Sequence, residues 1–243
     1  MNNIEFLNSI RDAFLIFLKG WQEGKAASRS TEKLKLLHGN IAKDIQQRLG
    51  SNYSVHALGI GDGKEEIIIG RYIDKKVDIT ICQNNKPIAG VGIKFVMQNF
   101  AQNANNYFEN MLGETANIQC QSVPYFQILV FPEKIPYFQS GRKFKKWEQL
   151  NQEKLKKYIT LSHDPLERYL HTPAKTLLYI VSLYQLEDQS NDINFTSNEQ
   201  LIEYYQHHQL KCSDWKLENL GNYVILNNYD EFMQKVIYRI KAI

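Results

Sequence analysis

The chain has 243 residues, of which 43% are hydrophobic and 23% charged. This composition is typical of one globular domain and excludes a disordered or collagen-like protein. The apolar runs are too short to cross a bilayer, and no signal peptide opens the sequence, so we expect no membrane association. Three widely spaced cysteines without CxxC spacing exclude a thiolate metal cluster and predict a reducing, bacterial cytoplasmic location.

The net charge of +3 is small, but the charges are unevenly distributed. Residues 133–157 contain eight Lys or Arg and three Glu, whereas residues 176–210 contain five acidic residues and no Lys or Arg. The basic segment is either a solvated helix or a surface that contacts phosphates.

Hydrophobic periodicity predicts two N-terminal helices. The first covers Ile4–Leu18, and the second begins after Ser30 or Thr31 and ends at Leu49, before Gly50. The elements expected after them are strands at Glu66–Tyr72, Lys76–Cys82 and Pro87–Val96, a helix at Met97–Leu112, a buried strand at Pro124–Pro132, and helices at Gly141–Tyr158, Pro173–Leu186, Glu199–Leu210 and Asp230–Ile243.

This order predicts an α/β (α+β) fold in which a central mixed β-sheet is flanked by helices. We expect residues 1–243 to form a single domain. Its catalytic core would cover residues 30–135, and residues 136–243 would form a helical C-terminal part.

Two charged residues lie in apolar strands that are expected to pair through a turn at Gln83–Lys86. Asp78 lies on one strand, and Lys94 follows sixteen residues later on the other. Burying an isolated charge is costly, so each of the two residues is expected to be neutralised by an opposite charge or to have a chemical role. A carboxylate that binds a divalent cation beside a lysine that orients water is suited to metal-assisted hydrolysis.

This hairpin, with the helix and strand after it, resembles the PD-(D/E)XK nuclease superfamily, and type II restriction endonucleases in particular. The resemblance covers roughly Glu66 to Phe131 and implies a restriction-endonuclease-like core. It also implies a Mg²⁺-dependent enzyme that cleaves double-stranded DNA at a short specific sequence, with Asp78 and Lys94 as catalytic residues and a cognate DNA methyltransferase in the same host.

The sequence departs from this family at Gly92, where the pattern has Glu or Asp two residues before the lysine. The helix after Lys94 offers Glu109 as a replacement, with Glu114 as an alternative. Glu66, before Asp78, and Glu32, on the first core helix, are further candidates. We therefore expect Asp78, Glu109 and Glu66 to hold the metal, with Glu109 as the second catalytic acid.

Two groups of residues are candidates for DNA contact. Residues 98–110 contain seven amide side chains, which can bind adenine in the major groove, and the basic segment can contact phosphates. The expected DNA-binding residues are Asn99, Gln102, Asn103, Asn106, Arg142, Lys143, Lys145 and Lys146.

Cutting both strands of a palindromic site needs two active sites, so a homodimer is expected. Two alternatives stay open. One is another nuclease of this superfamily that acts in repair or junction resolution. The other is a DNA-binding module that keeps the fold without catalysis, for which Gly92 is the main argument.

Overall fold

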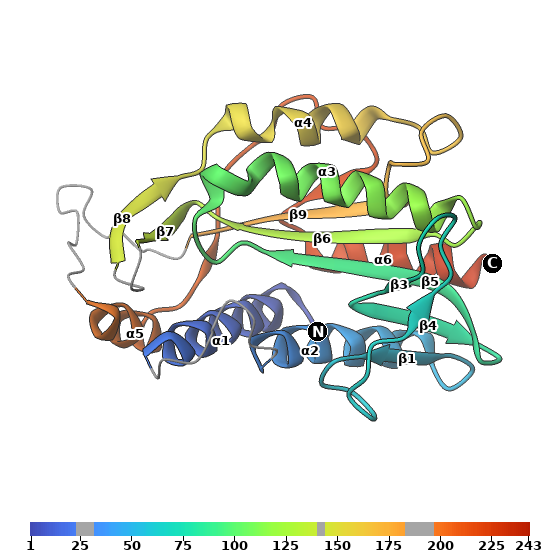
Figure 1. The fold of residues 1–243 in the computed structure, drawn as a ribbon, viewed down its shortest axis with the longest axis horizontal. Coiled ribbons are helices and arrows are strands. Elements are labelled where there is room, and N and C mark those ends of the chain that lie inside the picture. The colour runs from blue at the N-terminus through green and yellow to red at the C-terminus, as the bar shows by residue number, and fades with distance from the viewer. Residues whose placement is uncertain (23–31, 140–143, 183–196) are drawn as a thin grey trace.

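A computed structural model describes residues 1–22, 32–139, 144–182 and 197–243. It is a mixed α/β fold in which a central sheet lies between two layers of helices, as the sequence predicts (Figure 1). The expected caps Ser30 and Thr31, and the basic residues Arg142 and Lys143, lie outside the described residues.

The main sheet has the strand order β1-β4-β5-β6-β9-β10, and β11 also pairs with β9. The strands β1, β4 and β5 form an antiparallel meander, whereas β5, β6, β9 and β11 run parallel to one another, and β10 is antiparallel to β9. The bounds are β1 Ser54–Ala57, β4 Ile79–Gln83, β5 Lys86–Phe95, β6 Tyr125–Pro132, β9 Lys175–Ser182, β10 Lys211–Cys212 and β11 Val224–Leu226. Two small sheets pair β2 Ile67–Ile68 with β3 Lys75–Lys76 and β7 Lys134–Phe138 with β8 Phe144–Gln149.

Two helices, α3 and α4, cover one face of the sheet, and α1, α2, α5 and α6 lie on the other (Figure 1). Their bounds are α1 Asn3–Gln22, α2 Glu32–Leu49, α3 Phe100–Gln119, α4 Gln152–His163, α5 Asn198–His207 and α6 Tyr229–Lys241. Strand β6 is buried along its whole length. Its alternate side chains pack into the two helical layers, with Ile128 facing α1 and α2 and Phe131 facing α3 and α4.

The predicted β4–β5 hairpin is confirmed. Gln83 pairs with Lys86, and the two turn residues, Asn84 and Asn85, have positive φ angles of 51° and 61°. Asparagine tolerates this left-handed conformation, which a two-residue hairpin turn requires. The turn fixes the register that brings Ile79 opposite Val91, and it therefore places Asp78 next to the middle of β5.

Two predicted helices are strands. Pro173–Leu186 contains β9, an interior strand, because a short apolar run buried on both sides has no period that distinguishes a strand from a helix. Gly141–Tyr158 contains β8, and the helix α4 begins only at Gln152, where Asn151 caps it by accepting a 3.1 Å hydrogen bond from the Lys154 amide. The C-terminal part is therefore not purely helical.

Three other predicted bounds are wrong in detail. Strand pairing in Glu66–Tyr72 is restricted to β2, and Lys76–Cys82 is divided between β3 and β4. The helix expected at Met97–Leu112 continues to Gln119, because Gly113 lies on an exposed position of α3 and does not end it.

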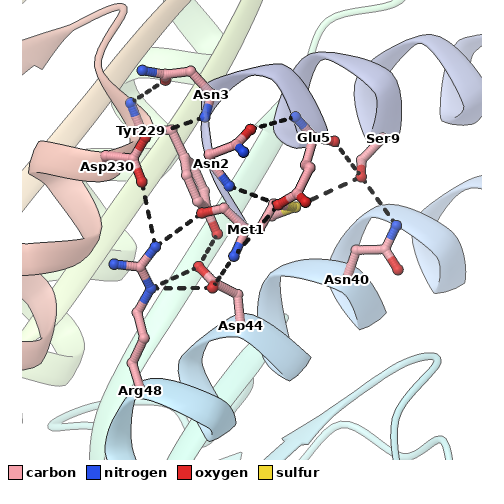
Figure 2. Close-up of polar contacts among 10 residues, drawn as sticks. All are labelled: Met1, Asn2, Asn3, Glu5, Ser9, Asn40, Asp44, Arg48, Tyr229 and Asp230. Carbon is pink, nitrogen blue, oxygen red and sulfur yellow. Dashed lines mark hydrogen bonds and ion pairs between the residues drawn. The ribbon is translucent and has the colours of Figure 1, made fainter.

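A buried polar network joins the N-terminal segment to α2 and α6 (Figure 2). Asp44 on α2 accepts hydrogen bonds from the Met1 amino group, from Arg48 Nε at 3.1 Å and from the Tyr229 hydroxyl at 2.9 Å. Arg48 also contacts Asp230 at 3.4 Å. The network fixes α6 against α2 and so closes the helical layer on that face of the sheet.

Candidate functional site

Asp78 lies directly before β4, beside the middle of β5. Its Oδ2 atom accepts a 2.7 Å hydrogen bond from the backbone amide of Ile93, which fixes the carboxylate against the neighbouring strand. Burial raises the pKa of Asp78 to about 6, although the Ile93 amide and the positive charges of Lys94 and Lys75 act in the opposite direction. The predicted proximity of Asp78 and Lys94 is confirmed, because both also line one cavity.

Lys94 lies one residue after Ile93 on β5. Its ammonium group lies 4.2 Å from the centre of the Tyr107 ring on α3, an arrangement that holds a cation by its attraction to the aromatic face. Desolvation lowers the pKa of Lys94, and the Asp78 carboxylate partly offsets that effect. The ring therefore holds the lysine at the cavity wall near Asp78.

Asp78 also belongs to a cluster of three potential metal ligands, with His38 on α2 and Glu65 before β2. One ligand atom from each lies within 4.8 Å of the others, and His38 Nδ1 is 3.9 Å from Asp78 Oδ1. Two atoms that bind one small cation at about 2.1 Å lie about 3.0 to 4.2 Å apart. The 3.9 Å separation between His38 Nδ1 and Asp78 Oδ1 falls within this range.

His38 supplies a second observation at this cluster. Its side chain is 1% exposed, and neither ring nitrogen has a hydrogen-bond partner among the described residues. Burial lowers the pKa of His38 to about 4, which keeps the imidazole neutral and able to bind a metal at neutral pH. A buried imidazole without a hydrogen bond is costly, and a cation between His38 and Asp78 would satisfy it.

Glu65 reaches this cluster because the loop after β1 packs closely on α2. A Cβ atom added at Gly39 would lie 2.8 Å from the carbonyl oxygen of Gly59, so only glycine allows this approach. Burial and the Asp78 carboxylate raise the pKa of Glu65. A carboxylate whose pKa is raised by a neighbouring carboxylate is typical of a site completed by a positive ion.

On its other side Asp78 faces a cavity of about 730 Å³. Its wall is formed by β5, β6, the middle and C-terminal part of α3, and the segment from the β2–β3 connection through β3 to Asp78. The charged groups that line it with Asp78 are Lys75, Lys94, Glu109 and Glu114. Asp78 therefore lies between the metal-ligand cluster and an open cavity.

The space above Gly92 is already occupied. A Cβ atom at this position would lie 2.6 Å from the Tyr125 hydroxyl and 2.8 Å from the Gln127 amide, both on β6. Tyr125 is hydrogen-bonded to Glu114, which also lies 3.7 Å from Lys75. Glu114 is thus linked to the position of the missing acid through Tyr125.

The other predicted acids lie elsewhere. Glu109 lines the same cavity, but it is exposed and its electrostatic partner is Lys157 on α4. Glu66 is exposed and outside the His38–Glu65–Asp78 cluster, although it is adjacent in sequence to Glu65. Glu32 forms an exposed ion pair with Lys35 at 2.7 Å.

The amide side chains predicted to contact DNA lie near the N-terminal end of α3. Asn99 exchanges hydrogen bonds with the backbone of Phe138 at 3.0 and 3.3 Å, so it anchors β7. Asn103 is half-buried and donates to the Asn99 carbonyl. Gln102 and Asn106 are exposed.

The described basic residues lie beside these amides. Lys145 and Lys146 are exposed on β8, and Lys146 lies 5.6 Å from the centre of the Tyr137 ring on β7. Gln102 reaches the hydroxyl of that same tyrosine at 3.4 Å. The exposed amides and the two lysines therefore share one surface, at the opposite end of α3 from the cavity.

His38 and Glu65 were missed by the sequence interpretation, although both left a signal. His38 interrupts the apolar stripe of α2 next to Leu37, and a histidine on a buried stripe needs a partner. The pair Glu65 and Glu66 enters an extended segment, where successive side chains point to opposite sides, so only one of them can face Asp78.

Comparisons with protein-family models, with curated proteins and with solved structures found no match to this chain. Among the described residues, none of the helices is both long enough and apolar enough to cross a membrane.

Proposed function

We propose that the chain is a metal-dependent nuclease that cleaves double-stranded DNA. The observation that carries the proposal is the position of Asp78, which has His38 and Glu65 on one side and Lys94 on the other. A carboxylate shared by a metal-ligand cluster and a nearby lysine is suited to phosphodiester hydrolysis.

In this proposal, Asp78, Glu65 and His38 hold Mg²⁺ or Mn²⁺, which when bound supplies Lewis acidity toward a phosphate oxygen. Lys94 orients the attacking water and offsets negative charge on the phosphate. Its contact with Tyr107 keeps the ammonium at the cavity wall, which reduces the cost of positioning it. Glu109 and Glu66, the acids expected from sequence, are secondary candidates for this metal site.

The order of elements supports assignment to the PD-(D/E)XK superfamily. A helix, a three-stranded antiparallel meander, a second helix and a parallel strand follow one another as α2, β1, β4, β5, α3 and β6. Asp78 directly precedes β4 and Lys94 lies on the neighbouring strand β5, an arrangement that supports the resemblance. Gly92 is the departure, and Glu114, which is linked to it through Tyr125, is a candidate to compensate for it.

The surface formed by Gln102, Asn106, Lys145 and Lys146 supports DNA as the substrate. A two-stranded ribbon such as β7–β8 fits a major groove. The distance from this end of α3 to the cavity follows from the helical rise of about 1.5 Å per residue. Gln102 and Glu114 are therefore about 18 Å apart along α3, so one duplex can reach both. We propose site-specific cleavage of the type II restriction kind by a homodimer, with a cognate methyltransferase in the host.

The test is cleavage of plasmid DNA with Mg²⁺ or Mn²⁺, followed by sequencing of the fragment ends. We expect cleavage that stops when the metal is chelated, and ends that share one short sequence. Ends without a shared sequence, together with a preference for branched DNA, would instead identify a repair or junction-resolving nuclease. DNA binding with no cleavage in either metal would favour the second candidate, a DNA-binding module without catalysis, for which Gly92 is the specific observation.

A further inference from the structure

The segment between β2 and β3 presents two large apolar side chains to solvent. Tyr72 is 83% exposed and Ile73 is 66% exposed. Exposed apolar residues usually occur singly, so two adjacent ones at the end of a protruding segment indicate a contact surface.

This segment is held rigidly by the C-terminal part of α3. The Asn117 side chain accepts hydrogen bonds from the amides of Tyr72 and Ile73, at 2.8 and 3.2 Å, and donates to the Ile73 carbonyl at 2.7 Å. The Asn117 carbonyl accepts from the Arg71 amide at 2.8 Å. Four hydrogen bonds from one residue fix the backbone that carries the two exposed side chains.

A glycine makes this close contact possible. A Cβ atom at Gly70 would lie 2.1 Å from the Asn117 amide nitrogen and 2.2 Å from the Ile73 carbonyl oxygen. Gln121, just beyond α3, donates to the Gly70 carbonyl at 3.1 Å. A preorganised apolar contact loses little conformational entropy on binding, which favours a role in recognition.

The two side chains lie at the edge of the proposed catalytic cavity. Tyr72, Ile73 and Lys75 line it together with Asp78 and Lys94. In Figure 1 the segment between β2 and β3 lies against the C-terminal end of α3, at the end of the sheet where β4 and β5 are labelled. A polymer whose phosphate reaches Asp78 across this edge of the cavity therefore passes Tyr72 and Ile73.

The charges around this segment favour a nucleic acid over a second copy of the chain. Arg71, Lys75 and Lys76 lie near the apolar pair in sequence, with two acids close to them, Asp74 and the Glu114 partner of Lys75, so the local balance stays positive. Positive charge that flanks exposed apolar side chains matches a phosphate backbone with stacked bases between its strands.

We infer that Tyr72 and Ile73 form a wedge that enters the DNA base stack beside the phosphate to be cut. Unstacking one base step bends the duplex toward the protein and widens access to its backbone. The deformation would bring the phosphate down into the cavity that contains Asp78. This inference rests on the proposed function for its partner, DNA, but it does not require that the protein cleaves.

The experiment measures base unstacking in the absence of divalent metal, so that no cleavage occurs. The probe is a pool of random-sequence duplexes of about 30 base pairs, each with a central 2-aminopurine, whose fluorescence rises when it loses stacking. The test variant is Tyr72→Ala/Ile73→Ala. The matched control is Tyr238→Ala/Ile4→Ala, which removes a tyrosine and an isoleucine that are each 70% exposed and lie outside the cavity wall.

We expect the wild type and the control to raise the fluorescence equally. The test variant should lose the rise and bind the duplex at least about tenfold more weakly, since stacking contacts contribute about 1–3 kcal/mol each. The wedge would be overturned if the wild type does not bind the duplex, or binds it without a rise in fluorescence. It would also be overturned if the test variant behaves like the control. A change in oligomeric state caused by the test variant, with DNA binding unchanged, would overturn it in favour of a dimer contact. A rise in fluorescence, together with no DNA cleavage when Mg²⁺ or Mn²⁺ is added, would support the wedge and contradict the proposed nuclease activity.

Discussion

Two aspartates in this protein, the buried Asp44 and the half-buried Asp78, have different surroundings. Asp44, with a side chain that is 3% exposed, receives hydrogen bonds from Arg48, Tyr229 and the Met1 amino group (Figure 2). Its negative charge is matched by two positive groups, so the cost of desolvation is offset. Asp44 is therefore a structural carboxylate that joins three segments of the chain.

Asp78 lacks such a set of partners. It has the backbone amide of Ile93, and its other neighbours include the carboxylate of Glu65 and the neutral imidazole of His38. Burial raises the pKa of Asp78 to about 6. Shifted pKa values near an open cavity are typical of functional sites. The two roles are therefore distinguished by the partners of each carboxylate and by its access to the cavity.

The largest expected effect separates the two aspartates by activity. Asp78→Asn should lower DNA cleavage at least about a thousandfold, because losing a metal-binding charge costs several kcal/mol of transition-state stabilisation. At neutral pH without metal, its thermal stability should not fall and should exceed that of the wild type, because burial destabilises the ionised Asp78 carboxylate. The control is Asp44→Asn, whose folded fraction should cut DNA at the wild-type rate. Wild-type cleavage by Asp78→Asn would remove the basis of the proposed site.

The second effect is on stability and falls on the other aspartate. Asp44→Asn should lower the free energy of unfolding by about 3 kcal/mol, because it leaves buried donors and the charge of Arg48 without their partner. Denaturant titration measures this change. Asp62→Asn, at an exposed side chain, is the matched control and should have almost no effect. Equal stabilities of the two variants would contradict the structural role of Asp44.

The third effect tests the metal cluster directly. His38→Gln should reduce the affinity for Mn²⁺ by about a hundredfold, the upper end of the effect of losing a supporting group, because it removes one of three ligands. Isothermal titration with Mn²⁺ alone measures this without DNA. His56→Gln is the control, since His56 on β1 lies outside the cluster and contacts Ser54. Unchanged Mn²⁺ affinity would place the metal elsewhere.

The fourth effect is a pH dependence with a defined sign. The pKa of Asp78 is about 6 in the folded protein against an ordinary value of 3.8, so the folded state binds the proton more tightly. The Asp78 contribution to stability without metal should therefore fall as pH rises from about 4 to about 6. The lowered pKa of His38 acts in the opposite direction between about 4 and 6.5.

The difference between the wild type and Asp78→Asn isolates the Asp78 part of this dependence. Chemical denaturation at several pH values, with a chelator present, should give a wild-type stability that declines relative to the variant across that range. A constant difference would mean that Asp78 titrates normally.

The smallest effect extends the comparison to a region that neither aspartate contacts. Lys145→Gln/Lys146→Gln should weaken binding to every DNA sequence and reduce the slope of log affinity against log salt by about 2, or one per phosphate contact. Lys235→Gln/Lys241→Gln, on exposed positions of α6, is the control of equal charge change. An unchanged slope would leave β8 as a solvated strand.

The sequence predicted the parts of this fold that local rules determine. The β4–β5 hairpin and β6 were found because their turn residues and apolar runs act over a few positions. Strand β9 was misassigned because its burial depends on α3, α4 and α6, which lie far from it in sequence. The β7–β8 ribbon was missed because its charges were interpreted as a helical face.

The candidate site was predicted in the same uneven way. Asp78 and Lys94 stood out because each interrupts an apolar strand. The second acid could not be assigned, because the sequence does not show in which direction the fold orients the side chains of Glu65, Glu66, Glu109 and Glu114. His38 reaches Asp78 through the packing of α2 against the sheet, and no spacing rule encodes that contact.

The N-terminal segment and α6 have a further consequence for how the protein is made. The backbone amide of Tyr229 donates to the Asn3 side chain at 2.8 Å, so two segments 226 positions apart complete one layer together. A chain emerging from the ribosome lacks α6 until nearly all of this sequence has been synthesised. Until then, Phe6 lacks the stacked ring of Tyr229, and the sheet face beneath α1 stays partly uncovered. This layer is therefore completed only when α6 docks, and the apolar side chains that α6 covers are open to other contacts until then.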